Sequence, residues 1–388
     1  MTLRIMTIYG TRPEAIKVAP IIKAIEAADG LESVTVVTGQ HREMLDQVNT
    51  MFEIVPDHDM NIMSADQSLN RIVAKVIAGV DEILAKEKPD AVIVQGDTST
   101  VMGAAVASFN RQIPVIHLEA GLRSGDISSP FPEEANRKLT SQIAALHLAP
   151  TPTSKDNLTR EDVSEKDIVI TGNSVIDTLM FATENLRVPF EDPRLEALRT
   201  VKEAGAAGRV LLVTAHRREN LGPAMEDIGQ AVAELAQKYP DLTVVFPIHK
   251  NPKVRAAIRP AVEKLENVYL MEPLAYAEFA QVLGLADVVL TDSGGVQEEA
   301  PSLGKPVLVM RENTERPEAV VAGTVRLIGT HRHRLVDEVS LLLDSEEAYA
   351  GMANAVNPYG DGQAARRTVE AIQWKFLGAE RPTDFIGI

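Results

Sequence analysis

Three acidic residues stand at the ends of predicted strands or at the start of a predicted helix, where acid–base chemistry could be carried out. Asp97 follows the strand-like residues 91–95, and Glu119 ends the run 114–119. Glu133 opens a helical pattern after two closely spaced prolines. Carboxylates crowded in a partly dehydrated cleft have raised proton affinities, so one can hold a proton while another removes one. If their segments converge, these residues predict proton transfer.

Each of these acids also has a structural alternative. Asp97 could cap a helix that begins near Ser99, and Glu119 could pair with Arg123. Glu133 could stabilise the N-terminal end of its helix through the helix dipole. Because structural ion pairs also perturb acids, the residue types alone leave both interpretations open.

A basic turn, GTRPE at residues 10–14, follows the first predicted strand and opens a helix. Its backbone N–H groups are therefore expected where an anion can bind. Arg12 and Lys17 could contact charged groups of a substrate; the alternative is a surface Arg and a Lys on the solvent face. The sequence contains neither G-x-G-x-x-G at this turn nor G-x-x-x-x-G-K-[ST] elsewhere, which argues against NAD and ATP.

A second glycine-containing turn, DSGG at residues 292–295, also follows a predicted strand. Gly294 and Gly295 permit close approach of a ligand, and Ser293 with the following helix N-terminus forms a candidate pyrophosphate cradle. Glu299 could take ribose hydroxyls, as acidic residues do in nucleotide sites. An ordinary strand-to-helix turn would use glycine as well.

The run HRREN at residues 216–220 is a third candidate, again at a strand end. His216 and the two arginines after it suit phosphate, whereas a solvated charge run is the alternative. Arg316 is a weaker candidate of the same kind.

Metal and hydrolase motifs are not found in the sequence. His117 and His147 lie in apolar strands and are expected to be core or wall histidines. Neither H-E-x-x-H nor a His and carboxylate cluster at metal-ligand spacing occurs, so we expect no dedicated metal site. The absence of G-x-S-x-G argues against a serine hydrolase.

The elements that must position these residues follow the pattern of repeated βαβ units, in which short apolar runs alternate with longer helical patterns. Strand-length runs that are apolar throughout are typical of parallel sheets covered by helices on both faces. Strands are predicted at residues 3–9, 34–38, 91–95, 114–119, 146–149, 168–171, 209–214, 243–247, 268–271, 288–291, 306–310 and 325–328. Helices are predicted at residues 13–28, 69–87 and 362–377.

The strand pattern restarts after residue 173, which predicts an α/β protein of two Rossmann-like, doubly wound parallel-sheet domains. The first domain is expected at residues 1–172 and the second at 173–360. Residues 361–388 are expected to carry a helix that returns to the first domain. Ligands of such sheets bind beyond the carboxyl ends of the strands, so the active site is expected in a cleft between the domains.

Composition narrows the class of protein. The chain has 388 residues, and 39 Lys and Arg against 55 Asp and Glu give a net charge of −16, which argues against broad nucleic-acid or anionic-membrane surfaces. It has no Cys, hence no disulfide or thiol nucleophile. No apolar run approaches the roughly 18–20 residues of a membrane span. A soluble protein of the reducing cytoplasm fits these observations best.

Six sequence blocks together resemble one family. They are GTRPEAIKVAP (10–20), QGDTST (95–100), HLEAGLRSGD (117–126), PFPEEANR (130–137), TAHRREN (214–220) and TDSGGVQEEAPSLGKPVLVMRENTERPEA (291–319). Over nearly its whole length the chain is similar to the bacterial non-hydrolysing UDP-N-acetylglucosamine 2-epimerases.

This resemblance implies a GT-B-like fold and reversible epimerisation of UDP-N-acetylglucosamine to UDP-N-acetylmannosamine, with no metal and no cofactor. The implied mechanism removes the C2 proton and expels UDP to give a bound 2-acetamidoglucal, to which UDP adds back. Only C2 is inverted. The product would supply N-acetylmannosamine-type sugars for cell-surface polysaccharide.

The resemblance also implies roles for individual residues. Glu119 is the first choice for C2 proton transfer and Asp97 for a partner role, with Glu133 and His216 completing the catalytic set. The positions that match the family's substrate-binding residues are Arg12, Lys17, Phe279, Ser293, Gly294, Gly295, Glu299 and Arg316. The sequence LAYAE at residues 274–278 departs from the polar pattern expected beside uracil, so backbone atoms are expected to contact the base there.

Relatives are often homodimers and can bind a second UDP-N-acetylglucosamine as an allosteric activator. Gln40, His41, Arg71 and His249 match positions suited to that site, although His41 and Arg71 could be ordinary exposed residues. The alternative functions are an epimerase of a modified UDP-sugar, a hydrolysing 2-epimerase, a GT-B glycosyltransferase and a catalytically inactive nucleotide-sugar sensor.

Overall fold

The computed structural model describes residues 2–39, 42–63, 67–206 and 208–387. By its internal contacts the chain forms two compact units. Unit 1 comprises Met1–Thr178 and Tyr359–Gly387, and unit 2 comprises Leu179–Pro358. The corresponding boundaries predicted from the sequence lie after residues 172 and 360.

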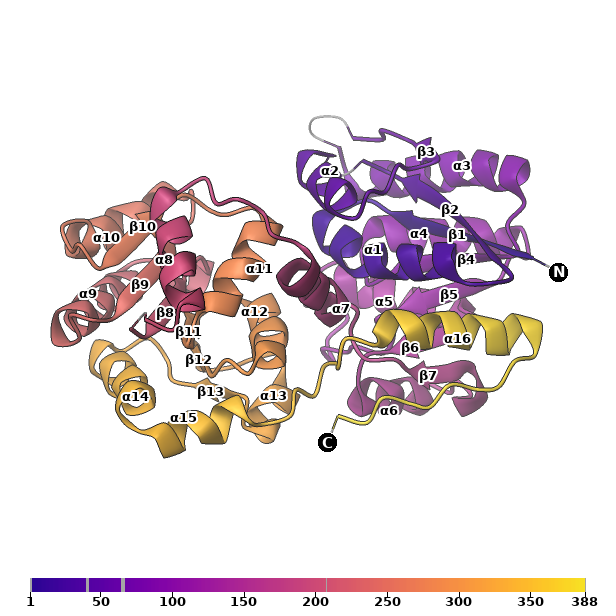
Figure 1. Ribbon diagram of the computed structural model, residues 1–388. Coiled ribbons are helices and arrows are strands. Elements are labelled where there is room, and N and C mark those ends of the chain that lie inside the picture. Colours follow the sequence, from indigo (N-terminus) through magenta and orange to yellow (C-terminus); the bar gives the residue numbers. More distant parts are fainter. Residues whose placement is uncertain (1, 40–41, 64–66, 207, 388) are drawn as a thin grey trace. The chain divides into compact units, whose positions relative to one another are not determined.

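Unit 1 is built on a parallel sheet of seven strands in the order β3-β2-β1-β4-β5-β6-β7 (Figure 1). The chain starts at the centre of the sheet and winds first to one edge and then to the other, which is the doubly wound topology. The strands are β1 (Leu3–Tyr9), β2 (Leu31–Val37), β3 (His58–Asp59), β4 (Ala91–Gln95), β5 (Val115–Leu118), β6 (Leu146–Ala149) and β7 (Ile168–Ile170).

Helices cover this sheet and bury its apolar strands. The helices are α1 (Arg12–Ala27), α2 (Arg42–Met51), α3 (Leu69–Glu87), α4 (Ser99–Asn110), α5 (Glu133–Ile143), α6 (Pro152–Arg160), α7 (Val175–Met180), which crosses the boundary of the unit, and α16 (Ala364–Leu377). Helices α3 and α4 pack on a core that includes Met6, Ile8 and Val94. Helix α1 packs against both α2 and α16, so the C-terminal helix is part of unit 1.

Unit 2 repeats the architecture with six parallel strands in the order β10-β9-β8-β11-β12-β13. The strands are β8 (Val210–Thr214), β9 (Thr243–Pro247), β10 (Val268–Met271), β11 (Val288–Thr291), β12 (Val307–Val309) and β13 (Val325–Leu327). The helices are α8 (Pro193–Glu203), α9 (Pro223–Lys238), α10 (Pro252–Val262), α11 (Tyr276–Leu285), α12 (Gly294–Glu299), α13 (Pro317–Ala322), α14 (Arg332–Asp344) and α15 (Glu346–Ala353). A short π-helix, Phe181–Asn185, follows α7.

The predicted fold class, two Rossmann-like parallel sheets, is confirmed, and each predicted strand is present. Strand β3 was not predicted, because its two polar residues at the sheet edge carry no apolar pattern. The two strand histidines are buried as predicted: burial lowers the pKa of His117 to about 4 and that of His147 to about 3. No helix in the described ranges is both long enough and apolar enough to cross a membrane.

The buried carboxylate of Asp177 bonds the start of α16 to the rest of unit 1. Asp177 in α7 accepts hydrogen bonds from the backbone N–H groups of Ala364 (3.2 Å) and Ala365 (2.8 Å), the first two residues of α16. These are donors that a helix start leaves without an intrahelical partner. Burial nevertheless raises the pKa of Asp177 to about 6, because the backbone N–H groups only partly offset the loss of water.

We expect Asp177→Asn to flatten the pH dependence of stability between about pH 4 and pH 6. With a folded pKa of about 6 against 3.8, the fold binds the Asp177 proton more tightly than the unfolded chain does, so the free energy of unfolding falls as pH rises through this range. The fall amounts to about 3 kcal/mol. Urea unfolding followed by Trp374 fluorescence measures the free energy of unfolding at each pH. Trp374 is the one tryptophan of the chain and lies in α16. The control is the exposed Asp156→Asn, and equal slopes in all three proteins would contradict the expectation.

Candidate active site

Glu119 lies directly after β5 with its backbone in the left-handed region, at a φ of 57°. For a residue other than glycine this conformation costs about 1–2 kcal/mol. Such strain persists only where the surrounding contacts require it, and it is concentrated at functional sites. The backbone of Glu119 is thus held in this position by its neighbours.

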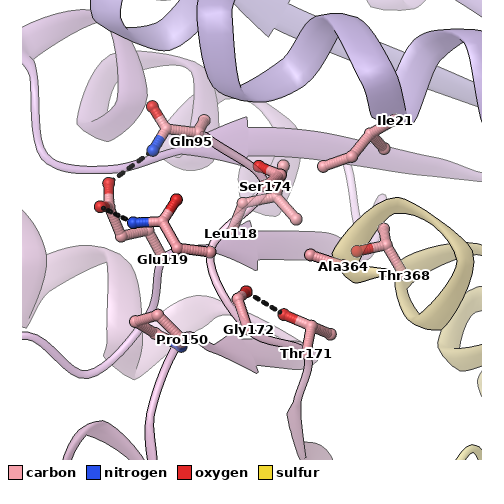
Figure 2. Close-up of a pocket in the computed structure, with 11 residues that line it drawn as sticks. Ile21, Gln95, Leu118, Glu119, Pro150, Thr171, Gly172, Ser174, Ala364 and Thr368 are labelled. Carbon is pink, nitrogen blue, oxygen red and sulfur yellow. Dashed lines mark hydrogen bonds between the residues drawn. The ribbon is translucent and has the colours of Figure 1, made fainter. Parts of the chain in front are cut away.

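The Glu119 carboxylate receives hydrogen bonds on both of its oxygens. Gln95 at the end of β4 donates its Nε2 to Oε2 at 2.6 Å (Figure 2). Asn173, in the segment after β7, donates its Nδ2 to Oε1 at 3.2 Å, and Lys17 of α1 forms an ion pair with the same oxygen. Three segments far apart in sequence therefore meet on one carboxylate.

Two of the structural alternatives that the sequence left open, one for Glu119 and one for Lys17, are wrong. Glu119 does not pair with Arg123, whose guanidinium instead bonds Glu161 at 2.7 Å. Lys17 is not on the solvent face, since its side chain is only 17% exposed and reaches Glu119.

Asp97 lies two residues beyond β4 and forms an ion pair with Arg137 of α5. Burial raises its pKa; Arg137 and Lys17 oppose this rise, and the negative charges of Glu119 and Glu133 add to it. The carboxylates of Glu119 and Glu133 are therefore both close enough to Asp97 for their charges to act on it. Helix α4 is capped by the Thr98 hydroxyl, so the capping role considered for Asp97 is wrong.

Glu133 is the first residue of α5 and is half-buried, a position that suits both of its interpretations. The next residue, Glu134, is completely buried and accepts hydrogen bonds from Ser124 N and Arg137 Nη1, each at 3.1 Å. Arg137 therefore bridges Asp97 and Glu134 and fixes α5 against the turn after β4.

The turn at residues 10–14 does not present the expected anion site. The carboxylate of Glu14, completely buried, accepts from Gly10 N at 2.6 Å, Thr11 N at 2.8 Å and the Thr98 hydroxyl at 2.5 Å. These N–H groups bind the protein's own carboxylate, an arrangement that the capping-box spacing of Thr11 and Glu14 could have indicated. Arg12 begins α1 beside this turn and is half-exposed.

In unit 2, Asp292 organises the carboxyl ends of β8 and β11. It is fully buried and accepts from the backbone N–H groups of His216 (2.9 Å) and Arg217 (2.9 Å) and from Asn220 Nδ2 (3.1 Å). Its Oδ1 lies 2.9 Å from His216 Nδ1, so this ring nitrogen carries a proton and is oriented by the carboxylate. Asp292 belongs to the DSGG turn, but its residue type and position in the sequence did not predict this role.

The run HRREN is only in part a cationic surface. Arg217 donates its Nε to the Asp292 carbonyl at 3.2 Å, which makes it part of the turn. Arg218 is exposed. His216 is also exposed and its ring centroid lies 5.9 Å from that of His249, so the structure brings these two histidines together.

Helix α12 begins at Gly294, directly after the strand and turn that the sequence predicted. A Cβ on Gly294 would lie only 2.6 Å from Arg316 Nη1, so glycine is what allows this guanidinium to lie against the helix start. Arg316 is oriented by Glu298, whose Oε1 accepts from Nε at 2.6 Å. Ser293 is half-buried at the N-cap, and Gly295 is exposed.

The candidate ribose acid, Glu299, is buried and accepts a hydrogen bond from the Tyr276 hydroxyl at 2.8 Å. Tyr276 begins α11, and Phe279 lies on the same helix, half-buried. Helix α11 therefore contacts Glu299 through Tyr276, which was not among the site residues predicted from the sequence.

The second-site residues are only partly observed. Gln40 and His41 lie outside the described residues. Arg71 is an exposed residue of α3 in unit 1, and His249 is an exposed residue of unit 2. Burial and the nearby His216 lower the pKa of His249.

A pocket in unit 1 adjoins the Glu119 carboxylate (Figure 2). Its lining comes from the strand ends, from α1, from the segment after β7 and from α16: Ile21, Gln95, Leu118, Glu119, Pro150, Thr171, Gly172, Asn173, Ser174, Ala364 and Thr368. In the described parts of the chain, no three His, Cys, Asp or Glu side chains come together in a way that could hold a metal ion.

Comparison with known proteins identifies the family. The family model of the UDP-N-acetylglucosamine 2-epimerases matches residues 23–373. The Escherichia coli (strain K12) UDP-N-acetylglucosamine 2-epimerase is 48% identical over 371 residues, covering 96% of this chain and 98% of the relative. Among solved structures, the Neisseria meningitidis enzyme bound to UDP-GlcNAc is 45% identical, with a TM-score of 0.82, over 95% of this chain and 99% of that chain. The Methanocaldococcus jannaschii enzyme is 32% identical, with a TM-score of 0.81, over 96% and 100%.

The chain is therefore similar to these proteins in fold and in sequence over nearly its whole length. The chain belongs to the UDP-N-acetylglucosamine 2-epimerase family.

Proposed function

We propose that this chain interconverts UDP-N-acetylglucosamine and UDP-N-acetylmannosamine by eliminating UDP and adding it back. The observation that supports the proposal is the Glu119 carboxylate, which lies after β5 and is paired with Lys17, while the negative charges of Glu119 and Glu133 both act on Asp97. Family membership gives the substrate class, since the related Neisseria meningitidis structure contains UDP-GlcNAc.

Unit 1 provides the residues that act on the sugar. Glu119 takes the proton from C2, the C1–O bond to UDP breaks, and a C1=C2 double bond forms. Return of a proton to the opposite face of C2 and addition of UDP to C1 complete the epimerisation. Asp97, whose pKa is raised by burial, suits the partner role because it can carry a proton at higher pH than an exposed aspartate.

Unit 2 provides the residues that stabilise the leaving group, UDP. Departing UDP carries growing negative charge on its diphosphate, which oriented cations and N–H groups stabilise. Arg316, held by Glu298, and His216, held by Asp292, are both oriented before a ligand arrives. Ser293, Gly294 and Gly295 supply the start of α12 beside them.

Incubation with UDP-N-acetylglucosamine alone tests this function against its alternatives. We expect an equilibrium mixture of two nucleotide sugars, resolved by chromatography or NMR. Unchanged substrate would favour a glycosyltransferase that needs an acceptor, or an inactive sensor. Steady accumulation of UDP with free N-acetylmannosamine would indicate a hydrolysing enzyme.

Glu119→Gln is expected to lose C2 exchange in heavy water and turnover together, by about 10²- to 10⁴-fold, while UDP affinity is retained. The substitution removes a proton acceptor with little change in shape. Deuterium incorporation at C2, followed by NMR, measures the effect, and the exposed Glu165→Gln serves as control. Near-normal exchange would exclude Glu119 as the base.

Arg316→Ala is expected to weaken UDP binding by about 10- to 100-fold, the usual effect of losing a charge-assisted hydrogen bond. Isothermal titration calorimetry with UDP measures it. The exposed Arg334→Ala in the same unit should bind UDP like the unmodified chain. An unchanged UDP affinity in Arg316→Ala would show that the diphosphate assignment is wrong.

A further inference from the structure

The segment through which the chain leaves unit 1 is bonded to the helix that carries Lys17. The Ser174 hydroxyl donates to the Lys17 carbonyl oxygen at 2.6 Å, and the Thr178 hydroxyl donates to the Ile16 carbonyl oxygen at 2.5 Å. Residues 171–178 therefore do not only link two parts of the chain. Their hydrogen bonds also hold in place the turn of α1 from which the Lys17 side chain reaches Glu119.

The same segment pairs with the segment through which the chain returns to unit 1. Asn173 N–H donates to the Tyr359 carbonyl oxygen at 2.7 Å. Gly172 has a φ of 83°, and a Cβ there would lie 3.4 Å from Gly360 Cα. A Cβ on Gly360 would in turn lie 3.0 Å from Ile176 Cγ1 and 3.3 Å from the Asn173 carbonyl oxygen. The two connections thus lie backbone against backbone, with glycine at the closest approach.

Asn173 links the paired segments to the carboxylate of Glu119. It is only 5% exposed, and its Oδ1 accepts from Val175 N at 3.1 Å. Because this bond fixes which side of the amide carries the oxygen, the Nδ2 side faces Glu119 Oε1, 3.2 Å away. One residue therefore binds the returning segment through its backbone and Glu119 through its side chain.

We propose that Asn173 is a positioning residue for Glu119, and that through it the orientation of the acid depends on the pairing of the two connecting segments. This inference rests on the proposed function. Asn173 takes no part in proton transfer. It favours one orientation of the carboxylate and, as a hydrogen-bond donor, favours the ionised form that accepts the C2 proton.

The first test compares Asn173→Ala and the nearly isosteric Asn173→Asp with the unmodified chain. Loss of a hydrogen bond to a charged group predicts a 10- to 100-fold fall in kcat for Asn173→Ala, with KM changed less than about threefold. The acidic limb of the kcat/KM profile should move to higher pH, and further in Asn173→Asp, where a second carboxylate faces Glu119. A role in folding alone would lower the amount of active enzyme without moving this limb.

Matched controls separate this effect from a general loss of stability. Asn157→Ala also removes a partly buried hydrogen bond of an amide side chain in unit 1, from Nδ2 to the Gly121 carbonyl oxygen at 3.0 Å, and should leave kcat and the pH profile unchanged. Trp374 fluorescence during urea unfolding checks that each variant is folded, and Asn173→Asp tests the proposal if Asn173→Ala does not fold.

The second test disturbs the pairing from the other side. Gly360→Val places a side chain against Ile176 and the Asn173 carbonyl without contacting Glu119, and should lower kcat in the same manner as Asn173→Ala. In the double variant the two losses should be less than additive, since the second change acts on a link already broken. Gly351→Ala, at a glycine with open space around it, is the control.

The outcomes distinguish the two proposals. If the unmodified chain does not epimerise UDP-N-acetylglucosamine, the proposed function fails and this inference fails with it. If it does, but Asn173→Ala and Asn173→Asp keep kcat within about twofold and leave the acidic limb in place, only the inference is overturned. Full additivity with Gly360→Val would overturn the coupling to the paired segments.

Discussion

The carboxylate of Glu119 is the point on which the architecture of unit 1 converges. Its donors come from α1, from the end of β4 and from the segment after β7. A carboxylate taken out of water is stable only when its oxygens are bonded, so a displacement of any of these segments leaves a buried charge less satisfied. The same bonds offset the strained backbone of Glu119, which places the acid just beyond its strand.

Both units use an internal carboxylate to complete their strand-end turns. In unit 1, Glu14 accepts the backbone N–H groups of Gly10 and Thr11 and binds the Thr98 hydroxyl next to Asp97. In unit 2, Asp292 accepts those of His216 and Arg217. Each carboxylate fixes a turn that carries a residue of the candidate site, and under the proposed function such preorganisation would lower the cost of stabilising the transition state.

The sequence predicted the sheets well because a parallel strand covered on both faces is an apolar run of strand length, as β4 and β11 are. It also located the candidate acids, because ligand sites lie at the carboxyl ends of such strands. The partners of those acids could not be read in the same way. Glu119 and Lys17 are 102 residues apart, and the nearer Arg123 was the more obvious partner from sequence.

The turn at residues 10–14, for which an anion site was predicted, shows a related limit. Strand, glycine and helix start were all in the predicted places, but the carboxylate that occupies the N–H groups belongs to the helix itself. Asp292 was overlooked for the opposite reason, since its role is visible only when β8 and β11 are paired. The position of a residue at a strand end is predictable from the sequence, whereas its hydrogen-bond partners depend on the folded arrangement.

A crystal structure of the chain soaked with UDP-N-acetylglucosamine would test the central claim most directly. If Glu119 removes the C2 proton, its nearer carboxylate oxygen should lie within about 3.5 Å of the sugar C2, the separation expected for a reactive pair. A well-ordered sugar whose C2 lies beyond reach of Glu119, Asp97 and Glu133 would contradict the account.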